Sequence, residues 1–231
     1  RTPGSALSRL ATTDPADHLT GRIADPPANL TIAAIDPVRE TARHVRQVLE
    51  TTGSRLDPEA RALLEEELRS PCIEEIAVFT AFAQAVAAGA DQFVVLDTAP
   101  TGHTLLLLDT TEAYHREVAR NAGRLSAEVR HLLPRLRDPD YTKILLVTLP
   151  EATPVHEAVA LRDDLRRAGI EPYAWVLNRS FHTIALTDPL LRAKRACERP
   201  YVTEVTGRLA AKVALVPFQS QSAMTPTSGV T

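Results

Sequence analysis

Six short apolar segments recur along the chain, and helix-length stretches lie between most of them. The segments are Ala6–Thr13, Leu30–Asp36, Gln92–Asp97, Lys143–Leu149, Tyr173–Asn178 and Lys212–Pro217. Several of them, such as VVLD, ILLVTL and VALVP, are continuously apolar, which is typical of parallel strands buried on both faces. The repeated order of strand, helix and strand predicts an α/β fold with a doubly wound, mostly parallel sheet.

Four of the intervening stretches have the length and the boundary residues of helices. They are Val38–Thr51, Pro58–Leu68, Ile73–Ala88 and Glu157–Ala168. Asp57 precedes the second and is a suitable N-cap, and Gly169 follows the fourth and is a suitable C′ residue. The third stretch is apolar on most of its faces, so we expect that helix to be buried.

The stretch Arg124–Asp140 combines a helical pattern with a helix-breaking proline. Its residues predict a helix that is broken at Pro134, followed by a turn at Asp138 and Pro139. An insertion of this kind between two strands is either a mobile, partner-facing element or a surface helix that covers the sheet.

Length, charge and cysteine usage narrow the class of protein. The 231 residues suffice for one large domain, which we expect to span residues 1–218, with a polar tail over residues 219–231. A net charge of −3 argues against nucleic acid as the main partner. Cys72 and Cys197 make no disulfide framework, so the reducing cytoplasm is the expected compartment.

No stretch of the sequence predicts a membrane span or a signal peptide. The longest uncharged run, Ile76–Ala90, is too short to cross a bilayer. The first residues lack the apolar core of a secretory signal. Any role at a membrane is therefore expected to go through a partner.

Asp97 ends an apolar strand-like run and opens a polar segment, DTAPTGHT. Open parallel sheets bind ligands at the carboxyl ends of their strands, and a carboxylate there commonly holds Mg²⁺ beside a nucleotide phosphate, directly or through water. Thr98, Thr101 and the nearby His103 make the segment a candidate phosphate-sensing loop. The alternative is that Asp97 caps the next helix and the threonines are ordinary turn residues.

A second short apolar run ends in Thr-Thr-Asp and a proline, with Asp14 as the aspartate, in the segment ATTDPADHL. Taken alone, TTDP is a turn, because Asp-Pro commonly opens one. Paired with the segment at Asp97, it predicts the other half of a two-switch nucleotide site. In that site Asp14 would orient or deprotonate the attacking water, and Asp97 would manage the metal.

Four segments together resemble the arsenical pump-driving ATPases. They are VVLDTAPTGHTLLLLD, ATTDPADHL, LRSPCIEEIAVFTAF and ILLVTLPEATPVHEA, and the resemblance runs from Ser8 to Phe218. It is strongest to the C-terminal nucleotide-binding half of the two-half enzyme. It implies a P-loop NTPase fold of the dimer-forming type, with ATP and Mg²⁺ as cofactors and a second ATPase half as partner.

The resemblance also implies what the activity is coupled to. In the family, ATP hydrolysis drives a membrane channel that exports arsenite and antimonite, with As(III) or Sb(III) as an activating ligand. The implied protein is cytoplasmic and peripheral at the inner face of the plasma membrane, through its pump partner. A metallochaperone is a further candidate partner.

Residue roles carry over by motif. Asp14 and Asp97 match the aspartates of the first and second switches. Asn178 matches the asparagine that reads the adenine ring, for which an amide offers both a donor and an acceptor. Pro217 lies where the family's loop covers the base. Without the resemblance, Asn178 would be a strand-end turn residue.

The implied metalloid ligands are Ser70, Cys72 and His103. A soft thiolate suits As(III) and Sb(III) by the softness rule that governs metal choice. The ligands of such a site come from two halves, so this chain would supply only part of it. Without the resemblance, Cys72 would be a small buried hydrophobe, and Cys197 matches no ligand segment and is expected to be structural.

One expected element of the family is missing from the sequence. A phosphate-binding loop needs closely spaced glycines and a lysine, yet no two of the nine glycines are closer than 13 positions and none of the three lysines follows a glycine. We therefore expect the first strand, the Walker A loop and the first helix to be absent, and little ATPase activity from this chain alone. Truncation is the favoured explanation over a natural non-hydrolysing half.

Two alternative functions stay open at this point. One is a relative of the ATPase that targets tail-anchored proteins, although the single methionine and the lack of a Cys-x-x-Cys motif count against it. The other is a half-domain that binds metalloid without hydrolysing ATP.

Overall fold

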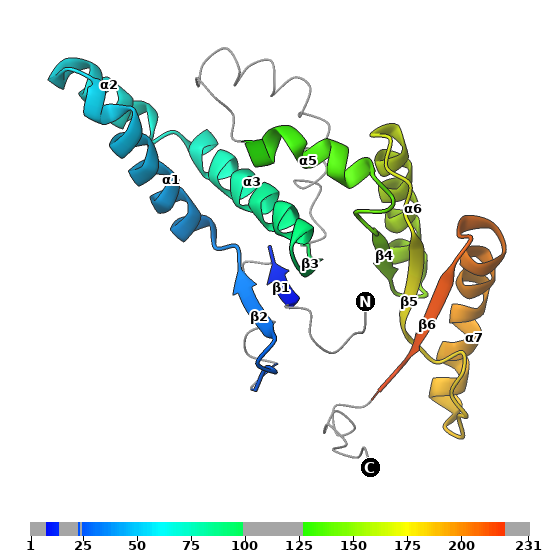
Figure 1. The fold of residues 1–231 in the computed structure, drawn as a ribbon. Coiled ribbons are helices and arrows are strands. Elements are labelled where there is room, and N and C mark those ends of the chain that lie inside the picture. The colour runs from blue at the N-terminus through cyan, green and yellow to red at the C-terminus, as the bar shows by residue number, and fades with distance from the viewer. Residues whose placement is uncertain (1–7, 14–22, 24, 99–126, 220–231) are drawn as a thin grey trace. The chain divides into compact units, whose positions relative to one another are not determined.

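The computed structural model of the protein describes residues 8–13, 23, 25–98 and 127–219 (Figure 1). The chain separates into two compact units, residues 1–135 and 136–231. Both contain parallel strands and helices, so the predicted α/β class is confirmed.

The first unit holds a three-stranded parallel sheet in the order β2-β1-β3. Its strands are β1 (Ser8–Thr12), β2 (Leu30–Ala34) and β3 (Phe93–Asp97). The central strand pairs Thr12 with Ala34 on one side and with Asp97 on the other. All three strands therefore end at the same level, and the residues that follow them meet at one edge of the sheet.

Capping residues specify where the helices of this unit begin. The helices are α1 (Pro37–Thr51), α2 (Pro58–Glu67) and α3 (Pro71–Ala87), with short 3-10 turns at Gly53–Arg55 and Ala88–Ala90. Asp36 accepts a hydrogen bond from the Val38 amide at 2.9 Å, and Asp57 accepts one from the Ala60 amide at 2.8 Å. Each helix also has a proline in its first turn, where the missing N–H costs nothing.

The core of the first unit forms around α3, as its apolar sequence predicts. Six of its residues are buried: Ala77, Phe79, Ala81, Ala83, Ala85 and Val86. Ala81 and Ala85 form a cluster with Ile35, which follows β2, and Leu96 of β3 packs against that cluster. The stretch Pro71–Ala90 is also the one described helix long and apolar enough to cross a membrane by length and composition, a test that core helices pass as well.

The second unit holds another three-stranded parallel sheet, in the order β4-β5-β6. Its strands are β4 (Leu145–Thr148), β5 (Ala174–Ser180) and β6 (Val213–Pro217). Its helices are α6 (Ala152–Arg167) and α7 (Pro189–Glu204), the latter ending in a π-helical turn, Val205–Leu209. Gly169 adopts φ 78°, so the predicted left-handed end of α6 is confirmed.

Helix α5 (Ala127–Arg137) corrects the prediction of a helix broken at Pro134. The helix continues through the proline, whereas the predicted turn at Pro139 does follow it. Val129, Leu132 and Leu136 are all buried and lie on both sides of Pro134 in the sequence. Burial of this apolar stripe holds the helix together despite the hydrogen bond that a proline removes.

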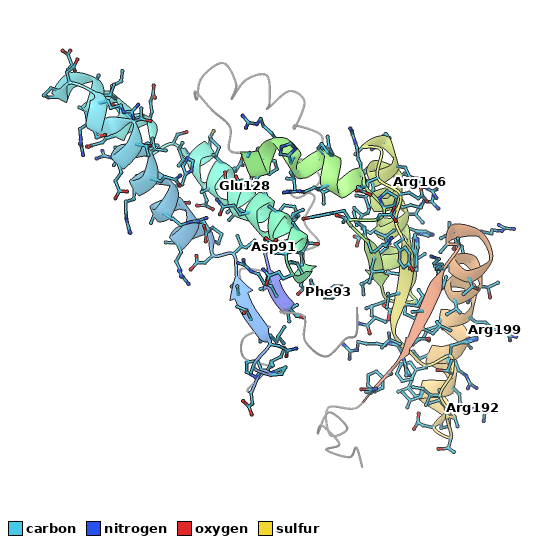
Figure 2. The ribbon with its side chains drawn as sticks, in the orientation of Figure 1. Asp91, Phe93, Glu128, Arg166, Arg192 and Arg199 are labelled. Atoms are coloured by element: carbon cyan, nitrogen blue, oxygen red, sulfur yellow. The ribbon has the colours of Figure 1, made fainter. Side chains whose placement is uncertain are left out.

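The prediction of one sheet buried on both faces differs from the structure in two ways. The described strands form two three-stranded sheets, because among those residues no backbone pairing joins β3 to β4. One face of β4 is also open: Leu145 and Val147 are 52% and 61% exposed, whereas Leu146 and Thr148, which alternate with them, are buried. Phe93, at the start of β3, is 67% exposed (Figure 2).

Candidate functional site

Asp97 lies at the carboxyl end of β3, beside the end of β1. The backbone amide of Thr13 donates a hydrogen bond to the carbonyl oxygen of Asp97 at 3.0 Å. The carbonyl of Thr12 in turn accepts from the amide of Ile35 at 2.8 Å, which ties the end of β2 to the same edge. The structure therefore places the Thr-Thr segment of one predicted switch next to the aspartate of the other.

The side chains at this edge suit a hard cation. Asp97 and Thr98 are both exposed there, and they offer carboxylate and hydroxyl oxygens. Oxygen donors with room for several waters are what Mg²⁺ requires. Asp14, Thr101 and His103 lie outside the described residues.

Asn178 and Pro217 lie at the carboxyl ends of neighbouring strands in the second unit. Ser180 of β5 pairs with Pro217 of β6, and a bulge lies between Leu177 and Ser180. Within the bulge, Arg179 adopts a left-handed φ of 55°, and its amide donates to the Oδ1 of Asn178 at 2.9 Å. Bulges at strand ends commonly re-aim a side chain, and here the residue concerned is the predicted base-reading asparagine.

Glu198 of α7 is a residue of this region that the sequence gave no reason to select. Its side chain is only 2% exposed and accepts hydrogen bonds from the hydroxyl of Ser180 and the amide of Phe181. The helix that carries it was not predicted, because Pro200 and the dense charges obscure its helical pattern. The one usable signal was the Asp188-Pro189 start, where Asp188 accepts from the Leu191 amide at 3.0 Å.

The predicted metalloid ligands Ser70 and Cys72 lie at the start of α3. Ser70 precedes the helix without a side-chain capping bond, and Cys72 is exposed in its first turn. The interpretation of Cys72 as a small buried hydrophobe is therefore wrong. Cys197, expected to be structural, is exposed on α7. Among the described residues, no group of three or more His, Cys, Asp and Glu side chains could hold a metal ion.

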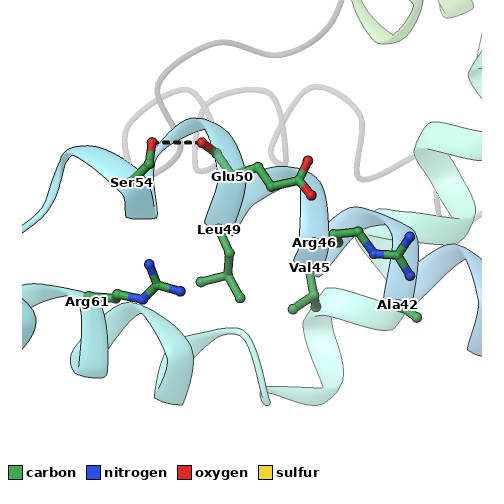
Figure 3. A pocket seen from close by; sticks show the side chains of 7 residues that line it. All are labelled: Ala42, Val45, Arg46, Leu49, Glu50, Ser54 and Arg61. Atoms are coloured by element: carbon green, nitrogen blue, oxygen red, sulfur yellow. Dashed lines mark hydrogen bonds between the residues drawn. The ribbon is translucent and has the colours of Figure 1, made fainter.

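A groove in the described part of the chain lies away from these residues, between α1 and α2 (Figure 3). Its volume is about 680 Å³, and it is lined by Ala42, Val45, Arg46, Leu49, Glu50, Ser54 and Arg61. The lining mixes short apolar side chains with charged ones and contains no methionine. It gives no support to the alternative of a targeting ATPase with a methionine-rich groove.

The parallel sheets and their helices make the chain an α/β protein, a class in which ligands commonly bind at the carboxyl edge of the sheet. The family model described as anion-transporting ATPase matches residues 10–133, and the chain belongs to that family. The family implies a P-loop NTPase fold.

Curated relatives match most of the chain. It is 50% identical over 208 residues to an arsenical pump-driving ATPase of Escherichia coli, and 49% identical over 208 residues to one of Acidiphilium multivorum. Each match covers 90% of this chain but 36% of the relative. A putative arsenical pump-driving ATPase of Halobacterium salinarum is 29% identical over 217 residues, 34% of its own length. The chain thus spans about a third of the length of these relatives.

Proposed function

We propose that this chain is one nucleotide-binding half of an ATPase that drives arsenite or antimonite export through a membrane pump. The relatives are arsenical pump-driving ATPases, and the length that the chain spans fits one half of such a protein. In this proposal the chain works in the cytoplasm, at the inner face of the membrane, with a second ATPase half and the pump as partners. A metallochaperone would deliver the metalloid.

The hydrogen bond between the Thr13 amide and the Asp97 carbonyl is the observation that supports this proposal most. It brings the two segments that resemble nucleotide switches to one edge of a parallel sheet. Asp14, the first-switch aspartate of this proposal, follows Thr13 directly in the sequence and lies outside the described residues. Metal-assisted phosphoryl transfer needs one group that holds the metal and another that orients the attacking water.

Within this proposal the residues have separate roles. Asp97 would hold Mg²⁺ through water, and Thr98 and Thr101 would contact phosphate oxygens. Asp14 would orient or deprotonate the attacking water. The Mg²⁺ ion, when bound, would neutralise the charge that develops on the phosphate oxygens.

Asn178 and Pro217 would form the base site. Both lie at the carboxyl edge of the second unit's sheet, on strands that are directly paired. The Asn178 amide has the donor and the acceptor that adenine requires, and Pro217 would cover the face of the ring.

Ser70, Cys72 and His103 would form this chain's share of a metalloid site. Cys72 is exposed, as a ligand shared with a second half must be. Because His103 follows Asp97 by six positions, metalloid binding at His103 would shift the segment that holds the metal. That coupling would make hydrolysis respond to the metalloid.

The chain carries no glycine-rich Walker A sequence, so we expect it to hydrolyse little ATP by itself. The test is ATP turnover by the purified 231-residue protein beside an intact relative, each with and without Sb(III). Very low turnover by the chain is expected, because no lysine and backbone cradle would hold the β- and γ-phosphates. Turnover comparable to that of the intact relative would refute this part of the proposal.

A further inference from the structure

Glu198 is a buried carboxylate that faces the end of β5 from α7. The Glu198 side chain is 2% exposed, and its Oε2 accepts the Phe181 amide at 2.9 Å and the Ser180 hydroxyl at 3.2 Å. The Ser180 oxygen also accepts the amide of His182 at 3.1 Å. A carboxylate with no exposure is costly unless its oxygens are hydrogen bonded, so this one fixes the backbone that supplies its donors.

The backbone that Glu198 holds is strained. Arg179, one residue before Ser180, has a φ of 55°, a region that non-glycine residues rarely adopt. Such conformations persist where surrounding contacts over-determine them, and they cluster at ligand sites. The contacts on the C-terminal side of Arg179 include the two hydrogen bonds that Ser180 and Phe181 donate to Glu198.

Aromatic contacts extend this arrangement to the neighbouring strand. The rings of Phe181 and Phe218 stack with their centroids 4.8 Å apart, and the Phe218 amide donates to the Ser180 carbonyl at 3.0 Å. The Arg179 guanidinium lies over the Phe218 ring, 5.5 Å from its centroid. A hydrogen bond, a ring stack and a cation–π contact therefore join the ends of β5 and β6 beside Asn178 and Pro217.

We infer that Glu198 is a positioning residue for the nucleotide base. By holding Ser180 and Phe181, it keeps the bulge in the one conformation that presents the Asn178 amide to the base, with Pro217 at a fixed distance across the strand pair. This inference rests on the proposed base site at Asn178. It adds a residue that would touch no ligand and would act on base selectivity rather than on phosphate binding.

The test compares ADP and GDP affinity in the 231-residue protein and its variants, by displacement of a fluorescent adenine nucleotide. Glu198→Ala removes both hydrogen bonds, whereas Glu198→Gln keeps an acceptor oxygen for both donors. Glu157→Ala, at an exposed position of α6, is the matched control. Melting temperatures of all variants report any general loss of stability.

A positioning role predicts a change in the ratio of the two affinities. Glu198→Ala should lower the preference for ADP over GDP about tenfold, the size of one lost hydrogen bond, and leave GDP affinity unchanged. Glu198→Gln should restore the preference to within about twofold. An unchanged ratio in Glu198→Ala, or an equal loss for both nucleotides, would overturn the inference.

Two further variants keep the outcome decisive. If Glu198→Ala fails to fold, Ser180→Ala is the substitute, because it removes only one of the bonds to Glu198. It should lower the ratio of ADP to GDP affinity about threefold, and no change in that ratio would also overturn the inference.

Asn178→Ala tests the base site itself. The base-site proposal is refuted if the unaltered protein prefers neither nucleotide, or if Asn178→Ala keeps the preference for ADP. In either case the inference about Glu198 is refuted too. If Asn178→Ala loses the preference while Glu198→Ala keeps it, only the role of Glu198 is refuted.

Discussion

The backbone amide of Thr13 lies 3.0 Å from the carbonyl oxygen of Asp97, and the hydrogen bond between them joins the ends of two parallel strands. Strand β1 is the central strand of its sheet, and this contact aligns its carboxyl end with that of β3. The polar segments that follow β1 and β3 must therefore start side by side. This is the geometric basis for assigning a metal and phosphate site to the first unit.

Replacing Pro134 by alanine should stabilise the protein. The proline lies inside α5 and cannot donate a hydrogen bond to the preceding turn, and it is exposed, so the change opens no cavity. Regaining that bond and relieving the ring clash should raise the free energy of unfolding by up to about 3 kcal/mol. Urea unfolding measures the change. Pro139→Ala, in the following turn, is the control, and a Pro134→Ala variant no more stable than that control would contradict a continuous α5.

Some strands and helices of this fold can be predicted from the sequence, and others cannot. The strands ending at Asp97 and Pro217 are predicted with their C-terminal residues, because an apolar run that stops at a polar residue or a proline is a strong local signal. Helix α7 was missed, because Pro200 and many charged residues hide its periodicity. The continuous α5 was missed because burial of Leu132 and Leu136 is a tertiary effect, and it outweighs a local helix breaker.

The residues of the candidate site also fall into those that the sequence predicts and those that it does not. Motif resemblance was sufficient to select Asn178 and Asp97, because their chemistry is visible in the residue type and in the strand end. It could not select Glu198. The proposed role of Glu198 depends on its hydrogen bonds from α7 to the end of β5 and on a bulge that no local sequence pattern predicts. Contacts between residues distant in sequence are the part of a site that a single sequence conceals.

His44 should make stability depend on pH. Its pKa is lowered from the ordinary value, because burial disfavours the charged imidazolium and the neighbouring Arg43 repels it. The unfolded chain therefore binds more protons than the folded one below about pH 6.5, and the free energy of unfolding falls as the pH decreases through that range. His44→Gln should flatten this dependence when urea midpoints are compared at about pH 5.5 and 7.5.

The control for this prediction is His131→Gln, at an exposed position of α5. That variant should keep the pH dependence of the unaltered protein. An unchanged acid sensitivity in His44→Gln would show that other groups cause it.

Cys72→Ser should weaken Sb(III) binding. The thiolate is the softest donor among the proposed ligands, and a hydroxyl is a hard one, so we expect the affinity to fall by at least about tenfold. Titration of Sb(III) followed by calorimetry measures it. Cys197→Ser, which replaces the other exposed cysteine, is the matched control and should leave the affinity unchanged. Equal effects of the two substitutions would remove Cys72 from the metalloid site.

The proposed metal site at Asp97 is tested most directly by the Mg²⁺ dependence of nucleotide affinity in the variants Asp97→Asn and Asp91→Asn. The two aspartates are exposed and lie near opposite ends of β3: Asp97 is its last residue, and Asp91, which Figure 2 labels, precedes its start. If the carboxyl edge of the first sheet holds the metal, Asp97→Asn should reduce the gain in ADP affinity on adding Mg²⁺ by about tenfold, and Asp91→Asn should leave it intact. An undiminished Mg²⁺ effect in Asp97→Asn, or an equal loss in Asp91→Asn, would contradict a nucleotide site at this edge.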